Sequence, residues 1–264
     1  MKQIKYRFFV LFLIFALLGM PLSQSEALTE GTIANGAELA IGSGSIADGT
    51  AAIAIGGNAE ALGTCNIAVG RHTDAIGSFL LVIGDNSSVA VLDEHNNPTD
   101  TELYGGIALG NSSRVESDKG IAIGTSSHVF DNADNGIAIG EAYVYSTRGI
   151  AMGYNSTVSN ISAIAIGGMS TASGKYSISL GSAANSSSEG SIAVGDASQS
   201  TGTSSIAIGT GARSDSVNSL AFGPGSLVEE QNSETSENSI AIGPGAKVIK
   251  ASSSIAIGEN ASIG

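Results

Sequence analysis

The acidic stretch near residue 95 holds the densest set of metal-type ligands in the sequence. Asp93, Glu94, His95 and Asp100 supply carboxylate oxygens and one imidazole nitrogen. Their spacing does not fit a calcium loop of the form D-x-[DN]-x-[DN]-G, in which alternate residues turn toward one ion. We therefore expect no metal site and no cofactor.

The other residues that could act as nucleophiles or bases are scattered. His72 and His128 lie far apart along the chain, and Cys65 is the single cysteine. Their positions produce no Ser–His–Asp or Cys–His set. The sequence thus predicts a protein that is not an enzyme, with Cys65 as a small buried hydrophobic residue.

The feature that organises the chain is a four-residue phrase: aliphatic, small, aliphatic, glycine. It occurs 15 times, and nine of the fourteen intervals between its closing glycines are 14 residues long. The closing glycines are Gly42, Gly56, Gly70, Gly84, Gly110, Gly124, Gly140, Gly153, Gly167, Gly181, Gly195, Gly209, Gly223, Gly243 and Gly258. A fixed period of this kind indicates an array of stacked structural repeats.

One repeat, at residues 53–63, reads I-A-I-G-G-N-A-E-A-L-G. Two short apolar runs are separated by glycine-rich turn signals, which predicts two short strands and two turns in each 14-residue coil. Helix is disfavoured because each glycine in a helix interior costs about 1 kcal/mol. The expected fold class is all-β, a parallel solenoid of about 15 coils.

The middle residue of the phrase is alanine in 13 of its 15 copies, the exceptions being Val82 and Ser179. Side chains alternate between the two faces of a strand. We expect the flanking aliphatic residues to fill the coil and the alanines to face outward. An outward column that is apolar and small predicts contact with further copies of the chain. This predicted interface column consists of Ala40, Ala54, Ala68, Ala108, Ala122, Ala138, Ala151, Ala165, Ala193, Ala207, Ala221, Ala241 and Ala256.

The second strand of each coil has a different pattern. Its predicted outward positions hold polar or charged residues such as Glu60, Asp74 and Arg213. That side of the solenoid is therefore expected to face water.

The charge balance argues against a nucleic-acid partner. The chain carries a net charge of −13 and only 11 lysines and arginines. A nucleic-acid-binding protein needs a concentrated basic surface, so we expect no such partner.

The N-terminus has the pattern of a secretory signal. Lys2, Lys5 and Arg7 precede an apolar run over 8–20, and Ser25 to Ala27 form a small-x-small site. This predicts a signal peptide at 1–27 and an exported mature chain. The apolar run of about 13 residues is shorter than the roughly 20 that a spanning helix needs. We therefore expect no membrane span of its own in the mature chain.

Two polar, acidic insertions lengthen the period, one near 91–103 and one near 228–238. Both are predicted surface loops on the repeat scaffold, and such loops often carry binding residues.

The most complete repeats read N-S-L-A-F-G-P-G-S at 218–226 and N-S-I-A-I-G-P-G-A at 238–246. They resemble the head repeats of YadA-like trimeric autotransporter adhesins, whose 14-residue unit reads N-S-[VIL]-A-[IV]-G-x-x-[SA]. The resemblance covers nearly all of 28–264, which would form one head domain. It implies a left-handed parallel β-roll, a homotrimer, display on the outer membrane or cell surface, and a role in cell adhesion and virulence.

Heads of this family can bind extracellular matrix through N-S-x-A-x-G-x-x-S surfaces. The resemblance therefore implies a host matrix or cell-surface ligand, with a matching motif at Asn218, Ser219, Leu220, Ala221, Phe222, Gly223 and Ser226. The second copy departs from this pattern at Ala246.

Family members continue into a neck, a coiled-coil stalk and a barrel anchor, whereas no heptads or barrel strands follow Gly264. Three readings stay open. The chain is a surface or secreted adhesin head, a structural self-associating β-solenoid without a specific ligand, or the remnant of a truncated autotransporter.

Overall fold

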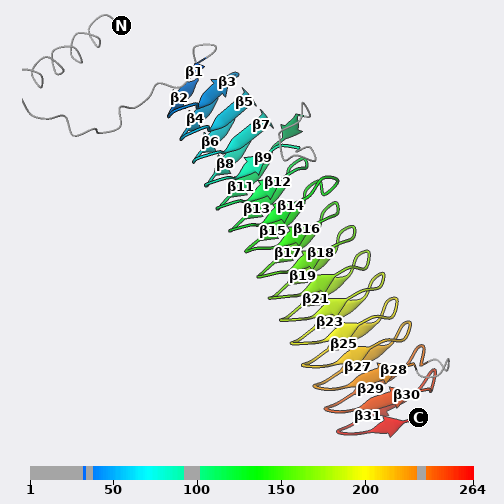
Figure 1. Ribbon diagram of the computed structural model, residues 1–264. Coiled ribbons are helices and arrows are strands. Elements are labelled where there is room, and N and C mark those ends of the chain that lie inside the picture. The colour runs from blue at the N-terminus through cyan, green and yellow to red at the C-terminus, as the bar shows by residue number, and fades with distance from the viewer. Residues whose placement is uncertain (1–31, 34–37, 92–101, 231–235) are drawn as a thin grey trace, which may run out of the picture.

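The computed structural model describes residues 32–33, 38–91, 102–230 and 236–264. These residues form a long stack of coils that follow one another in chain order (Figure 1). Each coil contributes one strand to each of two parallel sheets, and the described residues contain no helix. The predicted all-β solenoid of about 15 coils, with two short strands in each, is confirmed.

The first sheet has 15 strands and is built from the repeated phrases. Its strands are β2 (Leu39–Ile41), β4 (Ile53–Ile55), β6 (Ile67–Val69), β8 (Leu81–Ile83), β11 (Ile107–Leu109), β13 (Ile121–Ile123), β15 (Ile137–Ile139), β17 (Ile150–Met152), β19 (Ile164–Ile166), β21 (Ile178–Leu180), β23 (Ile192–Val194), β25 (Ile206–Ile208), β27 (Leu220–Phe222), β29 (Ile240–Ile242) and β31 (Ile255–Ile257).

The second sheet has 17 strands. They are β1 (Thr32–Ile33), β3 (Ile46–Asp48), β5 (Glu60–Thr64), β7 (Asp74–Ser78), β9 (Ser88–Val89), β10 (Leu103–Tyr104), β12 (Arg114–Val115), β14 (His128–Val129), β16 (Tyr143–Val144), β18 (Thr157–Val158), β20 (Thr171–Ala172), β22 (Asn185–Ser186), β24 (Gln199–Ser200), β26 (Arg213–Ser214), β28 (Leu227–Glu229), β30 (Lys247–Ile249) and β32 (Ser262–Ile263).

Successive coils pair in register, so equivalent residues form columns along the stack. In the first sheet Ile53 pairs with Ile67, Ala54 with Ala68, and Ile55 with Val69. The same pairing recurs along the sheet, so the predicted columns are confirmed.

The orientation predicted for these columns is wrong. Ala54, Ala122 and Ala138 have no exposed surface in the single chain. The flanking aliphatics on the same strands, such as Ile137 and Ile139, are partly exposed on the opposite side. The alanine column is therefore the inner wall of the coil and cannot be the surface that meets another copy. Alanine is required there because the interior between the two sheets is thin.

The inner residue of the second sheet and the residue before each first-sheet strand fill this interior together. Where the former is valine, the latter is often glycine. A Cβ added to Gly120 would lie 2.6 Å from Cγ1 of Val115 and 3.1 Å from that of Val129. Close packing of this kind leaves no room for both side chains to be large.

A different solution to the same packing problem appears further along the stack. There both positions are serine, and the hydroxyls of Ser200 and Ser205 lie 2.6 Å apart. Ser214 and Ser219 form the same pair at 2.6 Å. The buried hydroxyls satisfy one another, as polar groups away from water must.

Each coil closes through residues with left-handed backbone angles. Asn58, Cys65 and His72 have φ values of 52°, 57° and 51°. Each phrase also ends on a glycine, and at Gly56, with φ of 136°, an added Cβ would overlap the backbone of Gly70 in the next coil. Glycine therefore has a steric reason to close each phrase.

Departures from the 14-residue period are absorbed outside the first sheet. Ile107 still pairs with Leu81 across the longest interval, and Ala138 pairs with both Ala122 and Ala151 although the adjoining intervals are 16 and 13 residues. The centres of the two predicted loops, at 92–101 and 231–235, lie outside the described residues, as does the predicted signal peptide at 1–27.

Candidate binding surfaces

The outer face of the first sheet is a continuous apolar surface. It is formed by the first and third residues of every strand from β2 to β31, all of which are Ile, Leu, Val, Met or Phe. Ile166 and Phe222 keep 38% and 48% of their surface exposed. An apolar face that runs the length of a molecule normally marks a protein contact.

The outer face of the second sheet is polar over most of its length, as predicted. Glu60, Asp74 and Arg213 point outward, while Ala61, Ala75 and Ser214 on the same strands are buried. The two opposite faces of the solenoid therefore differ in chemistry, one apolar and one polar.

An aromatic stack interrupts the polar face at β14 and β16. The rings of His128 and Phe130 stack with centroids 3.5 Å apart, and Phe130 stacks on Tyr145 of the next coil at 4.1 Å. Tyr145 keeps 45% of its surface exposed. Rings in such offset stacks hold one another in place, so Tyr145 presents a fixed aromatic surface at one end of the stack.

A charged group supports the other end of this stack. Glu116 Oε1 lies 3.2 Å from His128 Nε2 and 3.6 Å from a terminal nitrogen of Arg114. The row Arg114, Glu116, His128, Phe130 and Tyr145 thus crosses three successive coils.

This stack was not predicted from the sequence, because the residues are 14 to 15 positions apart and show no local motif. Alignment of the second strands of successive coils would have placed Phe130 beside Tyr145, since β14 pairs with β16 in register.

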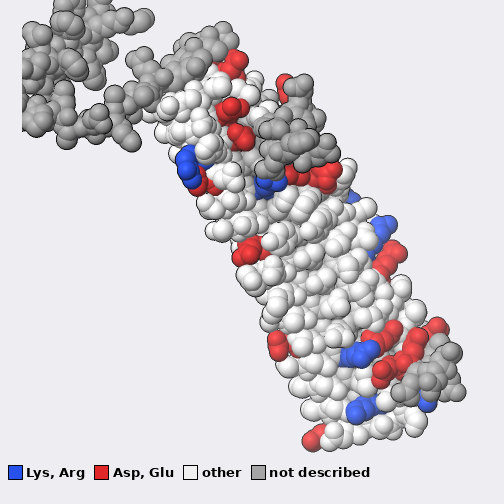
Figure 2. Space-filling model, in the orientation of Figure 1, with Lys and Arg blue, Asp and Glu red and all other residues white. Residues whose placement is uncertain are grey.

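Charged side chains gather toward the two ends and along the edges of the face in Figure 2, and a broad uncharged area lies between them. On the second sheet, Thr157, Thr171 and Asn185 occupy consecutive outward positions after Tyr143. The next charged outward residue of that column is Arg213, reached after Gln199.

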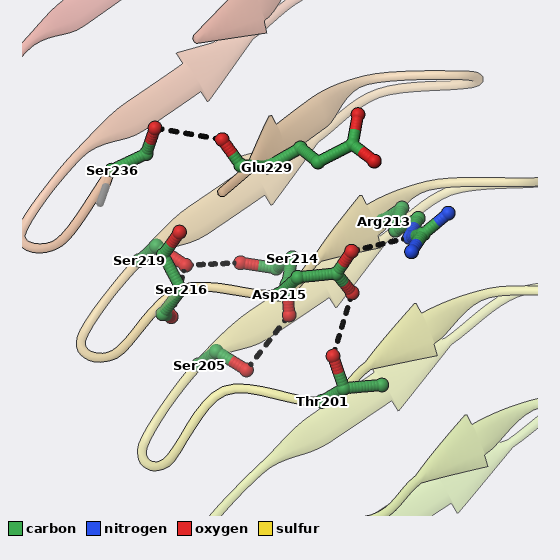
Figure 3. A network of polar contacts seen from close by, with 9 residues as sticks. All are labelled: Thr201, Ser205, Arg213, Ser214, Asp215, Ser216, Ser219, Glu229 and Ser236. Carbon is green, nitrogen blue, oxygen red and sulfur yellow. Dashed lines mark hydrogen bonds and ion pairs between the residues drawn. The ribbon is translucent and has the colours of Figure 1, made fainter. Parts of the chain in front are cut away.

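Arg213 belongs to a small polar network (Figure 3). Asp215 accepts hydrogen bonds from Thr201 Oγ1 at 2.6 Å and from Arg213 Nε at 2.5 Å. Beneath it, Ser205 Oγ donates to the carbonyl oxygen of Ser214 at 3.1 Å. The network joins the inner serines to the charged end of the polar face.

A carboxyl group near the other end of the polar face has a displaced titration. Burial raises the pKa of Asp74 to about 6, and the charge of Glu60 on the preceding coil adds to the effect. The register places these two carboxylates side by side. Like charges at this separation oppose ionisation of both groups.

The motif at 218–226 is mainly structural. Ser219, Ala221 and Ser226 are buried, and Ser226 Oγ donates to the carbonyl oxygen of Gly223 at 2.8 Å. Of the residues named for matrix binding, only Asn218, Leu220 and Phe222 present side chains to the outside. Any binding through this motif is limited to those three.

The residues considered for chemistry are not brought together. Cys65 is exposed, so the prediction that it is buried is wrong. His72 lies at an exposed turn and His128 in the aromatic stack. Among the described residues no three His, Cys, Asp or Glu side chains are grouped to hold a metal ion. The acidic cluster Asp93, Glu94, His95 and Asp100 lies outside them.

The part of the chain that the structure describes holds no helix long and apolar enough to cross a membrane.

Comparison with known proteins identifies the architecture. The family described as YadA head domain repeat (2 copies) matches residues 39–59, 104–127, 146–226 (in five overlapping matches) and 235–261, more than half of the chain. The chain belongs to this family of adhesin head repeats, and the predicted resemblance is confirmed.

A structural comparison finds the collagen-binding domain of the Yersinia adhesin YadA, solved by crystallography. It is 22% identical, with a TM-score of 0.32, and the match covers 72% of this chain and 74% of that one. No curated protein matches the chain.

Proposed function

We propose that the chain is the non-catalytic head of a trimeric adhesin, exported and held at a cell surface or released from it. Three copies associate through the outer face of the first sheet, and the polar face of the second sheet is turned toward the ligand. The family supports the adhesin role, and the apolar face supports the association.

The observation that carries this proposal is the continuous apolar surface over β2 to β31. Its aliphatic side chains are partly exposed in a single chain. Burial of apolar surface contributes about 25 cal/mol for each Å² removed from water. A surface repeated over 15 strands gives a large driving force for association, and three-fold closure leaves no copy with an uncovered apolar face.

The test is the molar mass of the purified protein by light scattering. The native protein should have three times the chain mass, whereas Ile164→Glu should reduce it to one chain mass. Ile164 lies near the middle of the apolar face, and a carboxylate there would be buried without a partner.

The control is Gln199→Glu, which places the same carboxylate on the opposite sheet and should leave the mass unchanged. A monomeric native protein, or an Ile164→Glu variant that stays trimeric, would refute the interface. Open fibres in electron micrographs would favour the self-associating structural solenoid instead.

Attachment is tested by binding of the purified trimer to immobilised collagen, the ligand named for the solved YadA domain. Binding above that of an albumin-coated surface would support matrix attachment. Loss of binding in Phe222→Ala, with the trimer mass unchanged, would place it at the exposed part of the 218–226 motif. Collagen binding that Phe222→Ala does not change would exclude that motif.

A further inference from the structure

The polar face contains a step between tall and short side chains. On β14 and β16 the outward residues are aromatic, and Tyr145 ends the stack with an exposed ring. The outward residues of the next three coils are short and uncharged: Thr157, Ser159, Thr171, Ser173, Asn185 and Ser187. We call these six residues the ledge.

The ledge has hydrogen-bonding capacity that the protein does not use. Within the described residues, the side-chain hydroxyls of Thr157, Thr171 and Ser173 have no hydrogen-bond partner. A hydroxyl is both a donor and an acceptor, and an amide side chain offers both kinds of group. The ledge can therefore serve a ligand that presents alternating donors and acceptors.

The ledge has defined ends. The aromatic stack closes one end at Tyr145, and at the other end Thr201 and Arg213 both donate to Asp215. Strands in a sheet are spaced at about 4.8 Å, so the four intervals from β16 to β24 span about 19 Å. That length suits a short chain molecule lying along the stack.

We propose that the ledge, together with the Tyr145 ring, binds a neutral oligosaccharide. Sugar rings carry hydroxyl groups around their rims, which match the ledge, and C–H groups on their faces. An aromatic face is partly negative and attracts such C–H groups. The proposal builds on the proposed function in one respect, since it needs this sheet to stay open when the other sheet is covered.

Charge narrows the ligand class to neutral sugars. The chain has a net charge of −13, and the ledge itself holds no cation that could pair with sulfate or carboxylate groups. Sulfated or sialylated glycans would be repelled by the overall field of the protein. A basic peptide would bind more favourably near Glu60 and Asp74, which are further along the stack.

The test uses an array of immobilised neutral, sialylated and sulfated oligosaccharides, probed with the labelled full protein. Neutral members should bind, and Tyr145→Ala should weaken their binding about tenfold, since loss of one aromatic contact is equivalent to such a factor. Thr171→Lys, which places a bulky cation in the middle of the ledge, should also reduce binding.

The matched control is Tyr154→Ala. Tyr154 is more exposed than Tyr145, at 59%, but lies at a turn outside the ledge, so its loss should leave glycan binding unchanged. Absence of any neutral ligand, binding of anionic glycans alone, or equal binding by Tyr145→Ala and native protein would each overturn the proposal.

Light scattering on each variant separates this proposal from the previous one. A native protein that binds neutral glycans but is monomeric would refute the trimer and support the ledge. A trimer that binds none of them would refute the ledge and leave the trimeric head standing.

Discussion

The paired filling of the interior predicts that two positions five residues apart depend on each other. Gly120 sits against Val115, and an added Cβ would lie 2.6 Å from the Val115 Cγ1 and 3.4 Å from the carbonyl oxygen of Ser117. Ser200 and Ser205 occupy the corresponding positions in a later coil, with hydroxyls 2.6 Å apart. We therefore expect Val115→Ser and Gly120→Ser to be tolerated together better than separately.

The magnitudes follow from the packing. Gly120→Ser alone forces a side chain into filled space and should cost about 1–3 kcal/mol. Val115→Ser alone removes two buried methyl groups, at about 0.5–1.5 kcal/mol each, and leaves a hydroxyl without its partner. In the double variant the new serine fills the space left by the valine, and the two hydroxyls can pair. The double variant should be more stable than the sum of the single effects implies by about 1–3 kcal/mol.

The assay is hydrogen exchange of the backbone amides in β12 and β13, which reports the free energy of opening locally. The reciprocal change, Ser200→Val with Ser205→Gly, serves as a second cycle in a distant coil. Single effects that add to within about 0.5 kcal/mol in both cycles would refute the idea that these positions fill one shared space.

Two further predictions concern charge and backbone. Because burial and Glu60 raise the pKa of Asp74 to about 6, the stability gained by protonation is present below pH 3.8 and is lost as pH rises through 6. Asp74→Asn should therefore raise the unfolding temperature at pH 7.5, by the equivalent of roughly 1–2 kcal/mol after solvent screening, and leave it unchanged at pH 3.5; an equal effect at both pH values would contradict this assignment. Gly56→Ala should destabilise the protein by about 1–3 kcal/mol because of its φ of 136° and the overlap with Gly70. Its neighbour is the control, since an added Cβ at Gly57 meets nothing nearer than 3.9 Å; thermal denaturation that ranks the two changes equally would count against the steric role of Gly56.

The sequence predicted the repeat, the two strands of each coil and the in-register columns, because a period of 14 residues leaves few ways to stack. It did not reveal which side of the first strand faces inward. Ile53 and Ala54 are both apolar, so the alternation that normally marks a buried face is missing. The better indicator was size, since a thin interior between two sheets admits Ala54 and excludes Ile53.

The same limitation applies to the site. The wet face of the second strand was predicted correctly at Glu60 and Asp74, where charge alternates with alanine. The stack of Phe130 on Tyr145 was missed because it depends on two coils lying in register, which no local pattern encodes. The burial of Ser219 and Ser226 was also unforeseen, since serine in a repeat suggests a surface until its neighbours are known.

The unbroken register of the first sheet has a consequence for how this protein can change over generations. Each phrase meets an equivalent phrase before and after it, as Ala165 meets Ala151 and Ser179. Loss or duplication of a whole 14-residue unit in the gene would therefore join surfaces that already fit. The rod would lengthen or shorten by about 4.8 Å for each unit, so its reach can be adjusted by recombination between repeats without a new interface having to evolve.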